Sequence, residues 1–173
     1  NVALMLDKVV RRTFPRTANV LFVTMLGFFI LLVAMRVNPW LALAASLTYG
    51  ISTNLIVSLV AGHVTKVVSI GYMAPAVGGV VLALRRKRLI GSLMTLVFVG
   101  LMINGNHFQI LYYFLLISIV VGIVYLIQAI KEKTLPDFAK AVGILALAAI
   151  GGLLPNTAKL YNAYEHSQET IRG

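Results

Sequence analysis

The sequence contains no cysteine among its 173 residues, and acidic residues are scarce. Without cysteine, the chain has no disulfide, no thiolate nucleophile and no thiolate metal site. Only five residues are Asp or Glu, against fifteen that are Lys or Arg, and charged residues make up only 12% of the chain. A soluble domain of this length needs a far more polar surface. Because 60% of the residues are hydrophobic, the composition predicts a multi-pass membrane protein.

Motifs for metal binding and for nucleophilic catalysis are missing as well. The three histidines, His63, His107 and His166, are scattered along the chain, so we predict no metal site and no cofactor for it. The net charge of +10 does not indicate nucleic-acid binding, because basic residues cluster at the ends of apolar runs, as in 85–88. Charge at such positions sets the orientation in the membrane and meets anionic lipid headgroups.

Residues 1–16 are amphipathic rather than continuously apolar. The chain begins with Asn1, and this segment lacks the apolar core of a signal peptide, which indicates a processed product or an internal piece of a longer protein. Val2, Leu6 and Val9 recur at roughly helical spacing, with basic residues on another side. We predict an interfacial amphipathic helix lying on the membrane, with an ordinary loop as the alternative.

Six apolar runs follow, each close to the roughly 20 residues that cross the hydrocarbon as a helix. The fourth is short. The sequence therefore predicts an all-α, polytopic transmembrane helical bundle over 17–155, followed by an extracytoplasmic tail over 156–173. The six runs lie near residues 17–35, 40–60, 67–84, 89–103, 108–130 and 138–154.

Prolines mark the boundaries of these runs. Pro39 and Pro136 predict helix starts, where a missing N–H is tolerated. Thr134 with Asp137 resembles a capping box ahead of the last span, with Asp in place of Glu. Pro75 falls inside the third span, and we expect it to kink that helix and to free a backbone carbonyl.

The distribution of Lys and Arg predicts the orientation of the bundle. The connections near 36–39, 85–88 and 131–140 carry eight basic residues, and the opposite side carries three once residues 1–16 are set aside. The amphipathic segment adds four more to that opposite side, but an interfacial helix is a weaker signal than a short loop. The positive-inside rule then makes the basic connections cytoplasmic. We expect a multi-pass membrane protein with this orientation.

A first polar segment, 61–75, lies between two apolar runs. His63 and Lys66 are three residues apart, so on a helix they share a face at the mouth of a span, with Tyr72 one or two turns away. A cation and an imidazole on one turn suit a phosphate or pyrophosphate. The alternative is structural: the Lys66 side chain extends to headgroups while His63 caps a helix.

A second polar segment lies between two later runs, in 104–109. Four hydrogen-bonding side chains occupy six positions there: Asn104, Asn106, His107 and Gln109. A solvated Asn-Gly turn is the alternative. The polar tail adds Tyr161 and Tyr164, which are suited to stack on a sugar. The predicted topology brings both segments and the tail to the extracytoplasmic side, where we expect them to line one site.

Several strings in the same order resemble the YfhO family of bacterial membrane proteins, in the versions found in Bacteroidetes-type bacteria. The resemblance covers nearly the whole chain, in 61–66, 70–75, 106–113 and 161–173. It implies a likeness to C-type glycosyltransferases, helical enzymes that use polyprenyl-phosphate-linked sugars at the extracytoplasmic face. It also implies that the chain is a central fragment, with the catalytic base, and possible carboxylate ligands of a divalent cation, in a loop upstream of Asn1.

The resemblance thus suggests transfer of a sugar from a polyprenyl-phosphate donor to an acceptor hydroxyl. The expected phosphate-binding residues are His63, Lys66 and Arg172; those expected to position sugar or acceptor are Asn106, His107, Gln109, Tyr161 and Tyr164, with Tyr72 nearby. No catalytic residue is assigned, and the fragment alone is expected to be inactive. Two alternatives are a non-catalytic subunit of a larger membrane assembly and a lipid or solute transporter, although only Asn54 and Ser58 form a deep polar pair.

Overall fold

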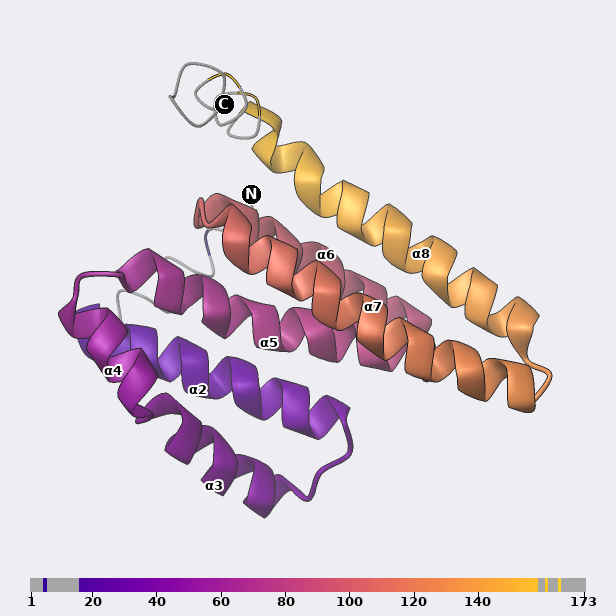
Figure 1. Ribbon diagram of the computed structural model, residues 1–173, viewed down its shortest axis with the longest axis horizontal. Coiled ribbons are helices and arrows are strands. Elements are labelled where there is room, and N and C mark those ends of the chain that lie inside the picture. The colour runs from indigo at the N-terminus through magenta and orange to yellow at the C-terminus, as the bar shows by residue number, and fades with distance from the viewer. Residues whose placement is uncertain (1–4, 6–15, 159–160, 162–164, 166–173) are drawn as a thin grey trace.

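The computed structural model describes Met5, residues 16–158, Tyr161 and Glu165. In this part of the chain every regular element is a helix, and the helices lie side by side with their directions largely alternating (Figure 1). The amphipathic helix predicted over 1–16 falls almost wholly outside the described residues. The elements are α2 (Arg16–Ala34), α3 (Pro39–Gly50), α4 (Thr53–Val60), α5 (Val64–Leu84), α6 (Arg88–Asn104), α7 (Phe108–Lys131), α8 (Leu135–Leu153) and the 3₁₀ turn η1 (Leu154–Asn156).

Five segments within the described residues are long and apolar enough to cross a membrane. They are Thr17–Ala34, Pro39–Val60, Val64–Leu84, Phe108–Lys131 and Leu135–Asn156, while α6 is a shorter apolar helix of 17 residues. The prediction of an all-α polytopic bundle is confirmed, including the short fourth span. Large apolar side chains remain exposed around the outside, as Ile119 and Val120 do on α7, which is the surface that lipid covers.

Helix α5 forms the centre of the bundle. In α5, 78% of the spanning residues are buried, against 11% in α7, and it packs against α2, α6 and α7. Small residues allow this central position, because without large side chains the neighbouring backbones approach closely. At Gly27 of α2, an added Cβ would collide with the carbonyl oxygen of Gly71.

Pro75 lies inside the third span, as predicted, and the expected kink stays a prediction. Helix α5 continues through Pro75 from Val64 to Leu84. Proline has no N–H to donate to the carbonyl four residues earlier, which is that of Gly71. This carbonyl lies against Gly27 of α2 in the helix interface. The carbonyl that Pro75 leaves without its helical donor thus belongs to the first polar segment and lies in the α2–α5 interface.

The α6 interfaces rely on the same close approach. A Cβ on Gly91 of α6 would lie 2.5 Å from the carbonyl oxygen of Gly79 on α5. Gly152 of α8 is similarly close to the backbone of α6. The buried Asn156 adds a polar contact, since its Nδ2 donates to the carbonyl of Gly100 at 3.0 Å. Asn156 thus joins α8 to α6 and is not part of a solvated tail.

The predicted second span, 40–60, is not one continuous helix. It begins as expected at Pro39, where the Asn38 side chain accepts from the N–H of Trp40 at 2.9 Å. It then breaks at Ser52, whose backbone is extended, between α3 and α4. The run 48–54 combines Gly with β-branched and short polar residues, all of which form helices poorly. The span prediction used hydropathy alone, which does not register this weak helix propensity.

The connections fall at two ends of the bundle. We call the end with connections 35–38, 85–87 and 132–134 the basic end, and the end with connections 61–63 and 105–107 the histidine end (Figure 1). Helices at the basic end stop at a residue with positive φ, namely Arg36, Arg86 and Lys133. Following residues close the last turn, as Val37 N–H does on Leu32 O at 3.0 Å, a common helix C-terminal motif.

The capping box predicted around Pro136 is wrong. Thr134 precedes α8, but its side chain makes no capping hydrogen bond. The Asp137 carboxylate instead forms ion pairs with Arg88 at 2.7 Å and with Arg86 at 3.2 Å. Two guanidinium groups nearby offer a carboxylate stronger, charge-assisted hydrogen bonds than a backbone N–H does.

Candidate functional site

The two predicted polar segments meet at the histidine end. Thr65 lies in the first turn of α5 and His107 directly precedes α7, and their side chains hydrogen-bond through Oγ1 and Nε2 at 2.8 Å. The residues are 42 positions apart in the sequence. The expectation that the two segments come together agrees with this contact, but the contact is made by Thr65 rather than by His63 or Lys66.

His63 and Lys66 flank Thr65 in the sequence. His63 is exposed at the start of α5 and its side chain makes no capping hydrogen bond. Lys66 is half-buried. Helices α5 and α7 both begin here, so both direct the positive ends of their dipoles toward the same region. The histidine end therefore combines backbone dipoles with one ammonium group.

The second segment forms a tight turn into α7. Asn106 is exposed with φ of 59°, a conformation that Asn adopts more readily than most residues. Gln109 is exposed, and its Nε2 donates to Tyr113 Oη at 2.6 Å. A Cβ at position 105 would lie 2.5 Å from Ser69 Oγ of α5, so the glycine there allows the turn to approach α5 closely. That close approach holds the turn against α5.

The remaining predicted residues are distributed differently. Tyr72 is only 6% exposed and packs in the core, with its ring centroid 6.3 Å from that of Phe98 on α6. The structure thus places it within the helix packing, below the surface of the histidine end. Tyr161 is exposed. Tyr164 and Arg172 lie outside the described residues.

Sequence reasoning did not single out Thr65. A lone threonine at a helix start is common, and nothing in its spacing distinguishes it from Thr48 or Thr53. The contact with His107 depends on how α5 and α7 are aligned along their axes. One signal could have found it: Thr65 lies between His63 and Lys66, within the first polar segment, which the predicted topology already brings to the same end as His107.

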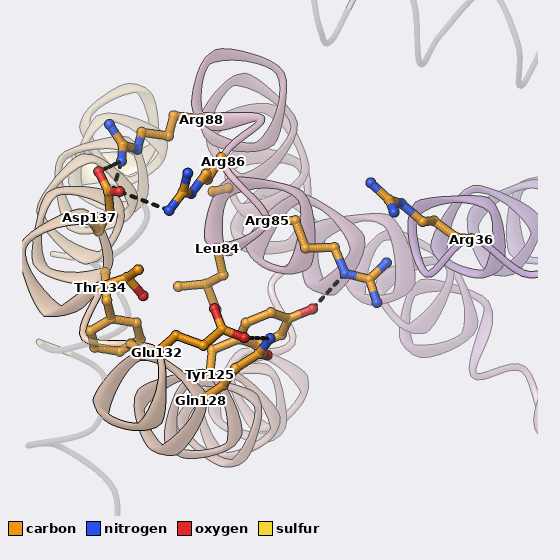
Figure 2. A pocket seen from close by; sticks show the side chains of 13 residues that line it. Arg36, Leu84, Arg85, Arg86, Arg88, Tyr125, Gln128, Glu132, Thr134 and Asp137 are labelled. Atoms are coloured by element: carbon orange, nitrogen blue, oxygen red, sulfur yellow. Dashed lines mark hydrogen bonds and ion pairs between the residues drawn. The ribbon is translucent and has the colours of Figure 1, made fainter.

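A second polar site, also missed, lies at the basic end. It is a pocket of ≈ 380 Å³ between the ends of α5 and α7 and the start of α8, and Arg36 reaches it from the end of α2. Arg85 crosses one side, donating from Nε to Tyr125 Oη at 2.7 Å and from Nη1 to the carbonyl of Ala34 at 3.2 Å (Figure 2). The sequence predicts for the 85–88 cluster a role in orientation and in meeting anionic headgroups, but not a pocket formed with Arg36 and Tyr125.

The opposite side of this arginine pocket is an ion-pair cluster. Asp137 of α8 pairs with Arg86 and Arg88 of the α5–α6 connection, which joins α8 to the rest of the bundle (Figure 2). Glu132, also in the pocket, accepts from Gln128 on its own helix at 2.8 Å. The pocket contains four arginines and these two acids, which leaves two positive charges uncompensated.

Neither end carries a recognisable metal centre. Within the described residues, no group of three or more His, Asp or Glu side chains is placed to hold a metal ion. Apart from the carboxylates of Asp137 and Glu132, the polar groups described at the two ends are arginine, lysine, imidazole, amide and hydroxyl. Such groups bind anions and sugars through hydrogen bonds and charge.

Together, the apolar helices and the two polar ends define the class of this chain as a multi-pass, all-α membrane protein. Comparison with known proteins finds no matching family, no matching curated protein and no matching solved structure.

Proposed function

We propose that this chain is the membrane-embedded part of a glycosyltransferase-like protein of the bacterial inner membrane. In this proposal the histidine end faces the extracytoplasmic side and binds a polyprenyl-phosphate-linked sugar. The supporting observation is the 2.8 Å hydrogen bond between Thr65 and His107, because it unites the two segments that resemble the YfhO family. The resemblance suggests the sugar-transfer reaction, and the contact supports one binding region formed by both segments.

The electrostatics of this region favour a phosphate. Two helix N-termini direct partial positive charge to it, which is the usual arrangement for binding phosphate at helix starts. Lys66 provides a full charge at the edge of the bundle. The connecting residues 61–63 and 105–107 themselves carry no carboxylate. A lipid phosphate placed at these helix starts would therefore meet Lys66 and two dipole ends of favourable sign, with the C-terminal ends of α4 and α6 nearby.

The proposed roles follow from these positions. Lys66 and His63 bind the donor phosphate while the polyprenyl chain remains in the bilayer. His107, oriented by Thr65, and Gln109 contact the sugar, on which Tyr161 stacks. In the transfer itself, an acceptor hydroxyl attacks the anomeric carbon, the bond to the lipid phosphate breaks, and the acceptor proton goes to a base. That base is expected in a segment upstream of Asn1, and Tyr164 and Arg172 keep their predicted roles.

Donor binding tests this proposal without requiring the complete enzyme. The purified chain in detergent is titrated with a polyprenyl phosphate and with the matching polyprenol, which lacks the phosphate. We expect the phosphate to bind more tightly, and Lys66→Ala to weaken its binding by at least about tenfold, because a charge-assisted hydrogen bond contributes about 1.5–3 kcal/mol.

Thr65→Val separates a built site from a general charge effect. It removes one hydroxyl at nearly constant volume and releases His107, so we expect weaker binding of the lipid-linked sugar. Thr48→Val is the matched control, since Thr48 Oγ1 is bonded only to Ala44 O of its own helix. Equal binding of phosphate and polyprenol, or equal effects of the two valine variants, would contradict the proposal. Turnover of a radiolabelled lipid-linked sugar by the full-length protein then tests the transfer step.

A further inference from the structure

A second cavity lies beside the arginine pocket and has the opposite chemistry. It is an apolar groove of ≈ 450 Å³ between α7 and α8, floored by α5 and α6. Leu84 and Phe138 line both the pocket and the groove. The charged and apolar spaces therefore lie side by side, with Leu84 and Phe138 at their boundary, which is the arrangement that an amphipathic molecule needs.

The length of the groove matches one leaflet of a bilayer. Along α7 it runs from Leu126 to Phe114, which corresponds to about 18 Å of helix. Half of the hydrocarbon core of a bilayer is about 15 Å. One acyl chain of a lipid with its headgroup at the basic end spans this distance.

The charge of the pocket identifies the headgroup. Arg36 and Arg85 point toward the same space (Figure 2). The Arg36 side chain has no hydrogen bond or ion pair with any described residue, although its backbone N–H donates to the carbonyl of Val33. Tyr125 accepts from Arg85, so its own hydroxyl proton remains available. Both carboxylates of the pocket are engaged elsewhere, Asp137 by the other two arginines and Glu132 by Gln128. An anion with several acceptor oxygens suits this arrangement.

We propose that the basic end binds one anionic glycerophospholipid of the surrounding leaflet. Its phosphate lies between Arg36 and Arg85, near the Tyr125 hydroxyl, and one acyl chain occupies the apolar groove between α7 and α8. The lipid joins α2, which carries Arg36, to the α5–α7–α8 side of the bundle. This site is at the opposite end from the proposed donor site and does not depend on it.

Native mass spectrometry of the purified chain in detergent tests the headgroup. Phosphatidylglycerol and phosphatidylcholine are added at equal concentration, and the bound lipid is counted. We expect phosphatidylglycerol to be retained preferentially, and Arg36→Gln and Arg85→Gln to weaken its retention by about tenfold or more. Lys87→Gln is the matched control, because it removes one positive charge from the connection that carries Arg85, at the same end as Arg36, but does not line the pocket.

A second pair of variants tests the acyl chain. A Cβ added at Gly122 or at Gly143 meets no atom within 4 Å, but only Gly122 lines the groove. Gly122→Phe fills the groove, so we expect it to abolish lipid retention while Gly143→Phe leaves retention unchanged.

Four results would overturn the proposal. The first two are equal retention of both lipids and an equal loss of lipid retention in Lys87→Gln and Arg36→Gln. The third is unchanged lipid retention in Gly122→Phe. The fourth is that inorganic phosphate stabilises the chain against thermal unfolding as much as phosphatidylglycerol does. The last result would show that a free anion suffices. Thermal unfolding of each variant without lipid shows whether it folds. If Arg85→Gln does not fold, Arg36→Gln still decides the test, because the Arg36 side chain has no partner among the described residues.

Discussion

Replacement of Gly91 by alanine tests the packing that centres the bundle on α5. An ideal Cβ at this position lies 2.5 Å from the carbonyl oxygen of Gly79 and 2.8 Å from Cα of Ala83. Ordinary van der Waals contact begins near 3.4 Å. The obstructing atoms belong to the backbone of α5, so no side chain can rotate away. Helices α5 and α6 must separate to admit the methyl group.

The expected effect combines two opposing terms. Overpacking a well-packed interface costs about 1–3 kcal/mol. Because the obstructing atoms here belong to the backbone, we expect a cost at the upper end of this range, about 3 kcal/mol. Alanine is a better helix former than glycine by about 1 kcal/mol. We therefore expect Gly91→Ala to lower the free energy of unfolding by about 2 kcal/mol. Gly143→Ala meets nothing within 4 Å, so only the propensity term applies and we expect stabilisation by up to about 1 kcal/mol.

The two variants should thus differ by about 3 kcal/mol, or about a hundredfold in the unfolding equilibrium constant. The assay is unfolding in mixed detergent micelles, by heat or by added dodecyl sulfate, monitored by circular dichroism. Gly91→Ala should unfold well before the unmodified chain, and Gly143→Ala at or after it. If Gly91→Ala proved as stable as Gly143→Ala, the close approach of α5 and α6 would be wrong.

Two further predictions concern contacts that join α8 to the bundle. Asn156→Ala removes the hydrogen bond to the Gly100 carbonyl, so we expect a loss of about 1 kcal/mol in unfolding free energy, whereas Asn54→Ala, at an exposed position on α4, should change it little. Asp137→Asn removes both ion pairs with the arginines, but the carboxylate is 43% exposed; we expect a small loss of stability that shrinks as salt is raised, and a loss that salt leaves unchanged would contradict this prediction.

The sequence predicts much of the fold because membrane spans have a strong signature. Six apolar runs lead to helices whose ends agree with the structure within a few residues, and Pro39 with Asn38 marks a helix start correctly. The break at Ser52 escaped because hydropathy measures burial in lipid and not local helix propensity. The capping box failed for a different reason. Its two residues fit the pattern, but Asp137 has arginine partners from another connection.

The sites were predicted less completely, because they depend on tertiary contacts. The meeting of two polar segments followed from topology alone, since both connect spans at the same end. Which side chains touch depends on how the helices are aligned, and this selected Thr65 over its two neighbours. The arginine pocket was not predicted from the sequence, because it requires Tyr125 of α7 and Arg36, which follows α2, beside the 85–88 cluster. A run of basic residues at a span end has the same appearance whether or not such partners surround it.

The central claim is that the histidine end and the basic end lie on opposite sides of one membrane, with the basic end in the cytoplasm. Because the chain has no cysteine, single cysteines report position without background. Ala61→Cys and Lys87→Cys both replace exposed residues, one at each end. With a membrane-impermeant maleimide, we predict that Ala61→Cys labels in intact bacterial cells and that Lys87→Cys labels only after the membrane is opened. Labelling of both from the same side, or of Lys87→Cys alone in intact cells, would contradict it.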